Sequence, residues 1–292
     1  MKSKSVVKQL TALTIAGFLM YACQKDNGGN KVQPTSALKT AADRPEEAFP
    51  GQTGQLAKGY FNGRSITYSL INGESVFQSD ILLPQEFVST TPAKTEGTGF
   101  SEASRHWPSD TLVYQLDSTL NTQQKNDVAK AMKMWSDSTP VRFRVRKTKE
   151  TAYVLIRNSS GNSATLGYTG RLQYVNIARS QEVGRYAHEL GHALGLFHEH
   201  TRKDRDDYVI IDFDNIQAGY EHNYDIYSGY DTSKGFEVDT LDFGSVMMYG
   251  SYYFAIDGSK PTMMKKDSST FNVQRVAPSA SDYRAMRHMY GN

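Results

Sequence analysis

The arrangement of the histidines constrains this chain more than any other feature of its sequence. Four of the seven histidines lie between positions 188 and 200. His188 and His192 stand at i and i+4, so on a helix they project from one face, one turn apart. Gly195 can end that helix, because glycine adopts the left-handed conformation without steric cost. A turn at this point lets His198 swing back toward the other two.

These residues predict a metal site. Three neutral imidazoles leave one coordination position open, as a catalytic zinc ion requires. Glu189 stands next to the face that carries the ligands, where it can reach a water on the metal. We therefore predict one zinc ion, bound by His188, His192 and His198. A chance HExxH pattern is the alternative, but the glycine and the third histidine at fixed offsets make chance a poor explanation.

The surrounding residues resemble the astacin family of metzincin zinc metalloproteases. The family signature HExxHxxGxxHExxRxDR is complete from His188 to Arg205, and the GSVMMY segment at 244–249 resembles the family's Met-turn. The resemblance covers most of residues 105–292. It implies an α+β fold for this domain: a zincin-like, metzincin architecture with a mixed twisted sheet, an active-site helix and a Met-turn.

The same resemblance implies a role for each matched residue. Glu189 would be the general base, which takes a proton from the attacking water and passes it to the leaving amine. Tyr249 would stabilise the oxyanion. Met247 would lie under the zinc ion, and Glu199 would anchor the new N-terminus of the mature enzyme. Arg275 would favour Asp or Glu after the scissile bond through a charge-assisted pair; an ordinary surface arginine is the alternative.

Periodicity predicts the elements that hold this site. A helix is expected from Asn121 or Thr122 to about Ser136, and Ser180 can cap the helix that carries the first zinc ligands. Strands are expected at 141–145, 153–156, 163–166 and 174–177. By the family resemblance, the strand at 163–166 would bind an extended peptide edge to edge.

The chain departs from the family in its cysteines and in its Met-turn. Cys23 is the single cysteine, so the two disulfides usual in family catalytic domains are absent. Met248 replaces the usual histidine of the Met-turn, a histidine that is not a zinc ligand. Neither departure touches the predicted catalytic set.

Residues 51–104 are predicted to be a prosegment, small and rich in β-structure. Asn-Gly dipeptides predict hairpin turns on both sides of an alternating strand at 65–70. Residues 76–81 resemble the family's prosegment motif FxGD, with Ser79 in place of the glycine. Asp80 would then occupy the open position on zinc and keep the precursor latent; an ordinary turn residue is the alternative.

The N-terminus is typical of an export signal at 1–22. Lysines precede an apolar run at 10–20, which is too short to cross a bilayer but fits a secretory signal. Ala22 before Cys23 resembles a bacterial lipoprotein signal, so lipid is expected on the cysteine; an ordinary secretory signal is the alternative. Residues 23–50, polar and containing Gly and Pro, predict a flexible tether.

The predicted function is that of a zinc-dependent endopeptidase, made as a latent and lipid-tethered precursor. Its substrates would be proteins or peptides outside the cytoplasm, and an activating protease would cut between about 84 and 105, releasing the enzyme from the membrane. The alternative is a catalytically inactive zinc-binding surface lipoprotein on a protease fold. A net charge of only +2 gives no support to nucleic-acid binding.

Overall fold

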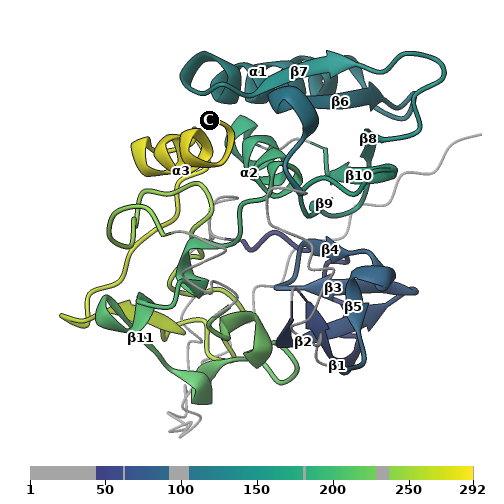
Figure 1. Ribbon diagram of the computed structural model, residues 1–292. Helices are drawn as coiled ribbons and strands as arrows, with labels where there is room; N and C mark the ends of the chain where they lie inside the picture. The colour runs from purple at the N-terminus through teal and green to yellow at the C-terminus, as the bar shows by residue number, and fades with distance from the viewer. Residues whose placement is uncertain (1–43, 62, 92–104, 180–181, 228–236, 292) are drawn as a thin grey trace, which may run out of the picture. The chain divides into compact units, whose positions relative to one another are not determined.

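The computed structural model describes residues 44–61, 63–91, 105–179, 182–227 and 237–291. Within these ranges most strands belong to one ten-stranded sheet, with the order β5-β1-β2-β3-β4-β9-β10-β8-β6-β7. The predicted prosegment supplies the first five positions in that order, and the domain that follows supplies the other five (Figure 1). The two parts of the chain therefore share one sheet, joined where β4 lies beside β9.

The strands of the prosegment form an antiparallel meander. They are β1 (Gln55–Phe61), β2 (Arg64–Ile71), β3 (Glu74–Phe77), β4 (Ile81–Leu83) and β5 (Val88–Ser89). Asn72 and Gly73 connect β2 to β3 with positive φ angles of 52° and 84°, as the Asn-Gly pair predicts. The apolar side chains of this meander pack around Phe61, Phe77 and Ile81, which are buried.

The strands of the following domain are mostly parallel. They are β6 (Thr111–Leu116), β7 (Arg142–Val145), β8 (Tyr153–Asn158), β9 (Ser163–Thr165) and β10 (Leu172–Ile177). Strands β7, β6, β8 and β10 pair in parallel, whereas β9 runs antiparallel to β10. The predicted mixed sheet is thus present, with strands at the predicted places.

The described ranges contain three α-helices: α1 (Thr122–Ser138), α2 (Val183–Leu194) and α3 (Ala280–Tyr290). Asn121, one of the two predicted caps, begins α1; it forms a capping box with Gln124, and the helix extends two residues beyond the expected end. Helix α2 packs against α1, and the indole of Trp135 donates a hydrogen bond to the Ala187 carbonyl. The cap of α2 is Glu182, which makes no side-chain capping bond, so the prediction of Ser180 as the cap is wrong; Ser180 itself lies outside the described residues.

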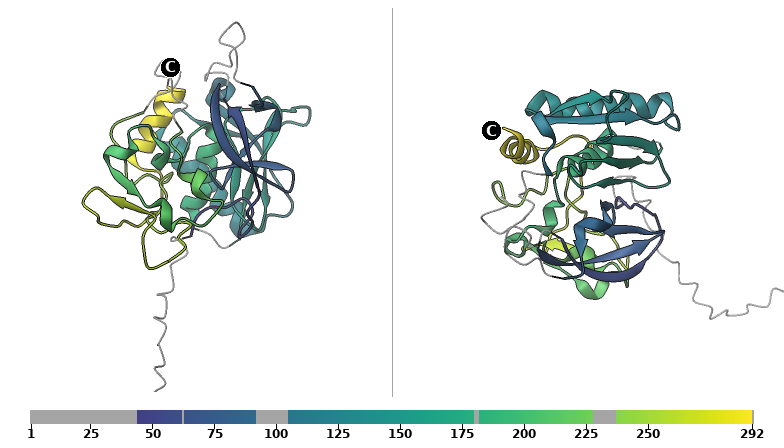
Figure 2. Two further views of the ribbon diagram at one scale, coloured as in Figure 1. Left: turned by 90° about the horizontal axis from the view of Figure 1, so that it is seen from below. Right: turned by 45° about the vertical axis from the view of Figure 1, so that its right-hand side comes forward.

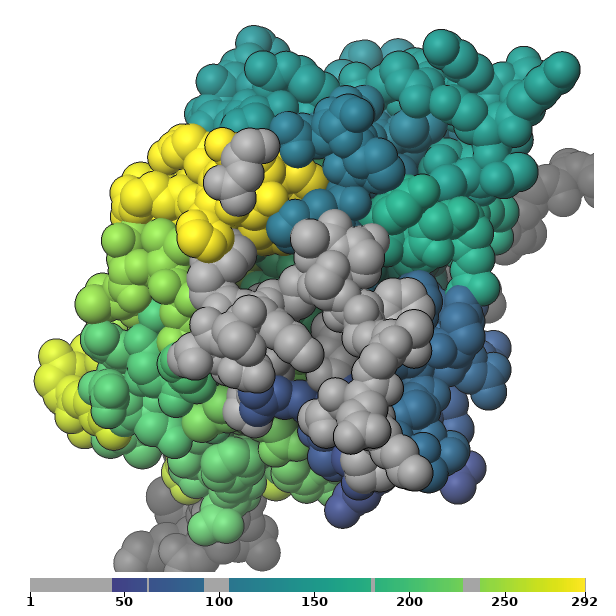
Figure 3. Space-filling view, in the orientation of Figure 1, coloured from purple at the N-terminus to yellow at the C-terminus, as the bar shows by residue number. Residues whose placement is uncertain are grey.

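The chain after α2 folds into short elements beside the prosegment strands (Figure 2). Strands β11 (Val209–Ile211) and β12 (Met263–Lys265) form a small antiparallel sheet. The 3-10 helices are η2 (Gln85–Phe87), η4 (Pro108–Asp110), η5 (Glu199–Thr201), η6 (Arg205–Asp207), η7 (Phe213–Asn215) and η8 (Glu221–Tyr224). In Figure 3 the blue surface of the prosegment lies against the teal surface of the domain.

Residues 44–50, which the sequence assigns to a flexible tether, are described and pack against the rest of the fold. Glu46 is 1% exposed and Ala48 is 4% exposed, and the Ala48 amide donates to the Ser79 carbonyl. Residues that are distant in the sequence bury this polar segment, and no local sequence pattern indicates such burial. The signal, Cys23 and the tether up to residue 43 lie outside the described residues. Among the described helices, none is long and apolar enough to cross a membrane.

Candidate metal centre

Helix α2 and the turn after it bring the three predicted zinc ligands together. His188 and His192 lie on one face of the helix and are fully buried. The helix ends at Gly195, which has a φ of 112° in the left-handed region and donates its amide to the helix carbonyls. The chain then returns, and the ring of His198 lies 4.7 Å from that of His192, centroid to centroid. The predicted end of the helix at Gly195 and the return of His198 toward the other two histidines are confirmed.

Two backbone carbonyls orient the first two imidazoles. The Nδ1 of His188 lies 2.7 Å from the Val246 carbonyl, and the Nδ1 of His192 lies 2.7 Å from the Leu196 carbonyl. A carbonyl only accepts, so each Nδ1 carries the proton and each Nε2 presents a lone pair. The two Nε2 atoms lie 3.1 Å apart. Two lone pairs at this separation fit a shared cation.

The third imidazole completes the ligand set. Burial lowers the pKa of His198 to about 4, so its ring is neutral near pH 7. Its Nδ1 lies 3.0 Å from the side-chain oxygen of Gln78, and its Nε2 has no hydrogen-bond partner among the described residues. The chemistry of this donor set, three nitrogens with lone pairs directed inward, fits zinc.

Asp80 supplies a fourth group to the cluster. Its Oδ2 lies 3.2 Å from the Nε2 of His188 and 3.3 Å from that of His198, and its Oδ1 lies 3.7 Å from the Nε2 of His192. The four candidate ligand atoms all lie within 4.8 Å of one another. Burial favours the neutral carboxyl, but His198 and His192 outweigh burial and hold the pKa of Asp80 well below its usual value. Asp80 therefore presents a carboxylate to the metal position.

A strained turn places Asp80 there. Gln78 and Ser79 both have positive φ angles, 50° and 72°, in the region that favours glycine. This explains why a glycine is typical at the position of Ser79. The Ser79 hydroxyl donates to the Glu46 carbonyl at 2.7 Å, which helps to hold the unfavourable conformation.

Glu189 lies fully buried next to the ligands. Both its carboxyl oxygens lack a hydrogen-bond partner among the described residues. Burial raises the pKa of Glu189 well above its usual value, and the neighbouring Asp80 charge raises it further. A buried carboxyl with unused oxygens and a raised pKa is typical of a general acid or base.

Met247 and Tyr249, from the segment that resembles a Met-turn, both lie next to the histidine cluster. A Cβ built on Gly191 would be 2.9 Å from the Met247 sulfur, so this methionine packs directly against α2 between its two histidines. The Tyr249 hydroxyl donates to the Gln78 carbonyl at 2.7 Å and lies 2.8 Å from the Ser79 hydroxyl. Burial raises the pKa of Tyr249 well above 10, so the phenol keeps its proton. Gln78 and Ser79 of the predicted prosegment thus contact this hydroxyl.

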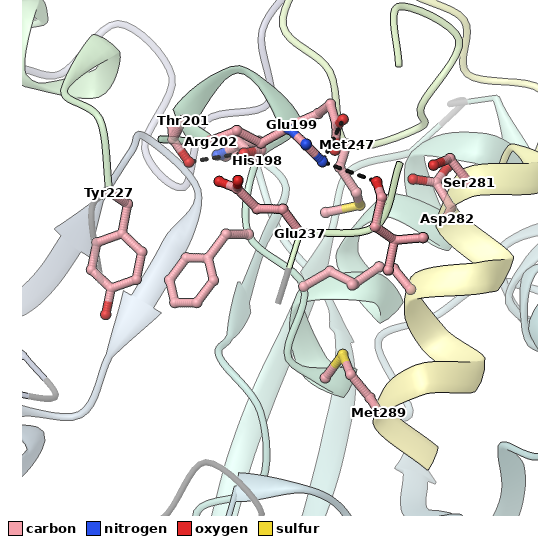
Figure 4. A pocket seen from close by; sticks show the side chains of 14 residues that line it. His198, Glu199, Thr201, Arg202, Tyr227, Glu237, Met247, Ser281, Asp282 and Met289 are labelled. Carbon is pink, nitrogen blue, oxygen red and sulfur yellow. Dashed lines mark hydrogen bonds and ion pairs between the residues drawn. The ribbon is translucent and has the colours of Figure 1, made fainter. Parts of the chain in front are cut away.

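Glu199 faces a separate pocket beside His198 (Figure 4). Its Oε1 accepts from the Asp242 amide at 2.9 Å and lies 3.7 Å from the Arg202 guanidinium. Burial raises the pKa of Glu199 to about 8. The Asp242 amide and Arg202 therefore do not offset the cost of burying the ionised carboxylate of Glu199.

Arg275 is buried, so the alternative of an ordinary surface arginine is wrong. It is 2% exposed, and its guanidinium forms a two-pronged ion pair with Glu46. Sequence reasoning missed Glu46, and it missed Arg185, which binds the same carboxylate. The available signal for Arg185 was an arginine on the predicted zinc helix, three residues before the first ligand; no sequence signal indicated Glu46.

Comparison with known proteins identifies the class. The family model described as Astacin (Peptidase family M12A) matches residues 99–291. The chain belongs to this family, and the predicted α+β zincin-like fold is confirmed.

Some of the individual relatives are described by name as zinc proteases. The chain is 41% identical over 192 residues to flavastacin of Elizabethkingia meningoseptica, covering 63% of this chain and 42% of that protein. It is 32% identical over 217 residues to the zinc metalloproteinase nas-4 of Caenorhabditis elegans, covering 73% and 68%. Among solved structures it is similar to high choriolytic enzyme 1, a hatching enzyme zinc-protease of Oryzias latipes, with 26% identity, a TM-score of 0.59, and coverage of 67% and 99%.

Proposed function

We propose that this chain is a zinc-dependent endopeptidase made as a latent precursor. The observation that carries the proposal is the convergence of three buried imidazole lone pairs beside a buried carboxyl without hydrogen-bond partners among the described residues, Glu189. His188, His192 and His198 would hold the zinc ion. A bound zinc ion supplies a Lewis acid and lowers the pKa of a bound water to about 7.

The protein groups divide the proton transfers between them. Glu189 takes a proton from the attacking water and delivers it to the leaving amine, a task suited to a carboxyl whose pKa is raised by burial. Tyr249, still protonated, donates a hydrogen bond to the oxyanion. Met247 supports the ligands from below through its contact with α2. A binding protein without activity would need neither Glu189 nor Tyr249, which argues against the alternative of an inactive zinc-binding lipoprotein.

The prosegment supports latency at two levels. Asp80 would occupy the position that the attacking water needs, and the turn before it would keep the Tyr249 hydroxyl, bound to the Gln78 carbonyl, from a substrate. Strand β4 also covers the edge of β9: the Ala164 amide donates to the Asp80 carbonyl, and the Leu166 amide donates to the Leu82 carbonyl. We propose that a substrate adds to this same edge once the prosegment has left.

Activation is proposed to follow from cleavage between about 84 and 105. The new amino terminus would reach Glu199, whose buried carboxyl, with a pKa of about 8, gains from a cation. Cleavage would also separate the domain from Cys23, the proposed lipid attachment point, so an extracytoplasmic enzyme would leave the membrane. Active, processed enzyme found in the membrane pellet and absent from the medium would contradict release.

The proposed activity is tested with the purified full chain, matured by limited trypsin treatment. We expect one zinc ion per molecule, cleavage of denatured casein, loss of cleavage with 1,10-phenanthroline, and its return with added zinc. A proteinase inhibitor that does not chelate, such as one for serine proteases, is the control. Stoichiometric zinc without cleavage of any protein or peptide would favour the zinc-binding lipoprotein.

A further inference from the structure

His200 is a buried histidine that has no part in the proton transfers proposed above. It follows the third predicted zinc ligand by two positions and is 0% exposed. Its Nε2 lies 3.0 Å from the Asn223 carbonyl, and a carbonyl only accepts, so this nitrogen carries the proton. Burial holds the pKa of His200 well below its usual value, which keeps the ring neutral. His200 is therefore a flat, neutral ring with one nitrogen bound to the backbone.

The ring of His200 stacks on the phenol ring of Tyr249. The two centroids lie 3.9 Å apart, and the angle between the planes is 24°. Within the described residues, every other aromatic contact of Tyr249 has a centroid distance of at least 4.6 Å and an interplanar angle of at least 49°. His200 thus supplies the flat surface on which the phenol lies, and the other rings meet it at a tilt or edge-on.

Residues of the domain hold His200 in this position. The ring donates to Asn223 in η8, and Arg205 connects the backbones of the same two segments. The Nη1 of Arg205 donates to the His200 carbonyl at 3.2 Å and to the Tyr224 carbonyl at 2.7 Å. Arg205 is itself 4% exposed. None of these partners belongs to the predicted prosegment, so its departure would leave them in place.

The hydroxyl of Tyr249 depends on the prosegment instead. It donates to the Gln78 carbonyl and lies 2.8 Å from the Ser79 hydroxyl. Removal of the prosegment would take away both of these contacts, whereas the phenol ring would keep its contact with His200. A donor to an oxyanion is effective only when it is held in place before the charge develops. In the matured enzyme, the stacked ring is a means of holding the phenol in its plane.

We propose that His200 is a positioning residue, whose stacked ring directs the Tyr249 hydroxyl to the oxyanion once the prosegment has left. The proposal rests on the proposed endopeptidase function. His200 is not one of the four residues whose ligand atoms converge at the metal position. Its effect is therefore exerted through Tyr249, and a change at His200 should alter kcat without altering KM or zinc content.

The test compares matured enzymes on one peptide. His200→Gln keeps a donor for the Asn223 carbonyl but removes the flat ring, whereas His200→Phe keeps a flat ring but removes the donor. We expect His200→Gln to lower kcat by about 2- to 10-fold, the range expected for one aromatic stack, and His200→Phe to retain most of the wild-type kcat. His288→Gln, a change of an exposed histidine on α3, is the matched control and should change nothing. His200→Leu, which also lacks a flat ring, serves if His200→Gln does not fold.

A double-mutant cycle shows whether His200 acts through Tyr249. In the Tyr249→Phe enzyme the hydroxyl is absent, so adding His200→Gln should lower kcat by less than about twofold more. An equal loss in both backgrounds would overturn the proposal. Zinc loss in proportion to the loss of activity would also overturn it, because the effect would then lie at the neighbouring ligand His198.

The outcomes also separate this proposal from the proposed function. If the wild type cleaves neither the peptide nor casein, the endopeptidase proposal fails. If the wild type cleaves and His200→Gln has the same kcat, the endopeptidase proposal stands and His200 is not a positioning residue. A fall in kcat that His200→Phe shares in full would show that the hydrogen bond to Asn223 matters and the stack does not, which contradicts the proposal.

Discussion

Replacing Asp80 by asparagine in the uncleaved precursor tests latency at its centre. The side chain keeps its size but loses its charge, and in the wild type the two carboxylate oxygens lie 3.2 to 3.7 Å from three imidazole nitrogens. Because the Nε2 atoms of His188 and His192 present lone pairs, the carboxylate would be held by the zinc ion between them, and an interaction with a charged group contributes about 1.5–3 kcal/mol. Losing about 2–3 kcal/mol raises the population with an open site by roughly 30- to 150-fold. Because β4 and Glu46 still hold the prosegment, we expect partial activity rather than full activity.

The assay follows cleavage of a quenched fluorescent peptide by intact precursor. Gel electrophoresis before and after the assay excludes processing, and metal analysis shows that zinc is bound. Glu74→Gln, an exposed change on β3 of the same prosegment, is the matched control and should stay latent. If the Asp80→Asn precursor holds zinc, remains intact and is as inactive as the wild type, then Asp80 does not maintain latency and the reasoning is wrong.

Three further changes test neighbouring parts of the site. Burial raises the pKa of Glu199 to about 8, so ionising this carboxyl opposes folding. The free energy of unfolding of the precursor should therefore fall as pH rises from about 4.5 toward 8, by up to about 1.4 kcal/mol per pH unit. Urea unfolding of Glu199→Gln should lack this dependence on pH, and equal slopes for variant and wild type would contradict the expectation. Gly184→Ala would put a Cβ 2.0 Å from the backbone of Arg275, so we expect a loss of about 1–3 kcal/mol in the free energy of unfolding, and an unchanged urea midpoint would refute this contact. Tyr249→Phe in the matured enzyme should keep zinc and KM but lower kcat by about 10- to 1,000-fold, which steady-state kinetics measures; an unchanged kcat would remove its role at the oxyanion.

The zinc ligands could be predicted because their placement depends on local geometry. Helical periodicity fixes His188 and His192 on one face, and Gly195 ends the helix with the positive φ that glycine tolerates. The return of His198 follows from that turn. Each step needs only neighbouring residues, and a short stretch of sequence contains them all.

Asp80 could be placed only through the resemblance to a family motif. Its imidazole partners lie more than 100 positions further along the chain, and no pattern in residues 76–81 records them. The left-handed turn before Asp80 cannot be predicted from the sequence either, because Ser79 stands where a glycine would indicate a positive φ. The hydrogen bond from Ser79 to Glu46 that helps to hold this turn is itself a long-range contact.

Glu46 could not be predicted at all, and the reason is physical. It stands among polar residues and prolines, a composition that indicates a solvated tether. Its burial arises from Arg185 and Arg275, which are 139 and 229 positions away. The position of Glu46 depends on its ion pairs with these two arginines, and sequence periodicity carries no information about ion pairs between distant residues.

Proton transfer by Glu189 during a zinc-dependent cleavage is tested by comparing one variant with the wild type. Matured wild type and Glu189→Gln are prepared in parallel, their zinc content is measured, and their rates on one peptide are compared. We predict one zinc ion per molecule in both and a rate lower by about 100- to 10,000-fold in the variant. A variant that binds zinc and cleaves at the wild-type rate would contradict the assigned role of Glu189.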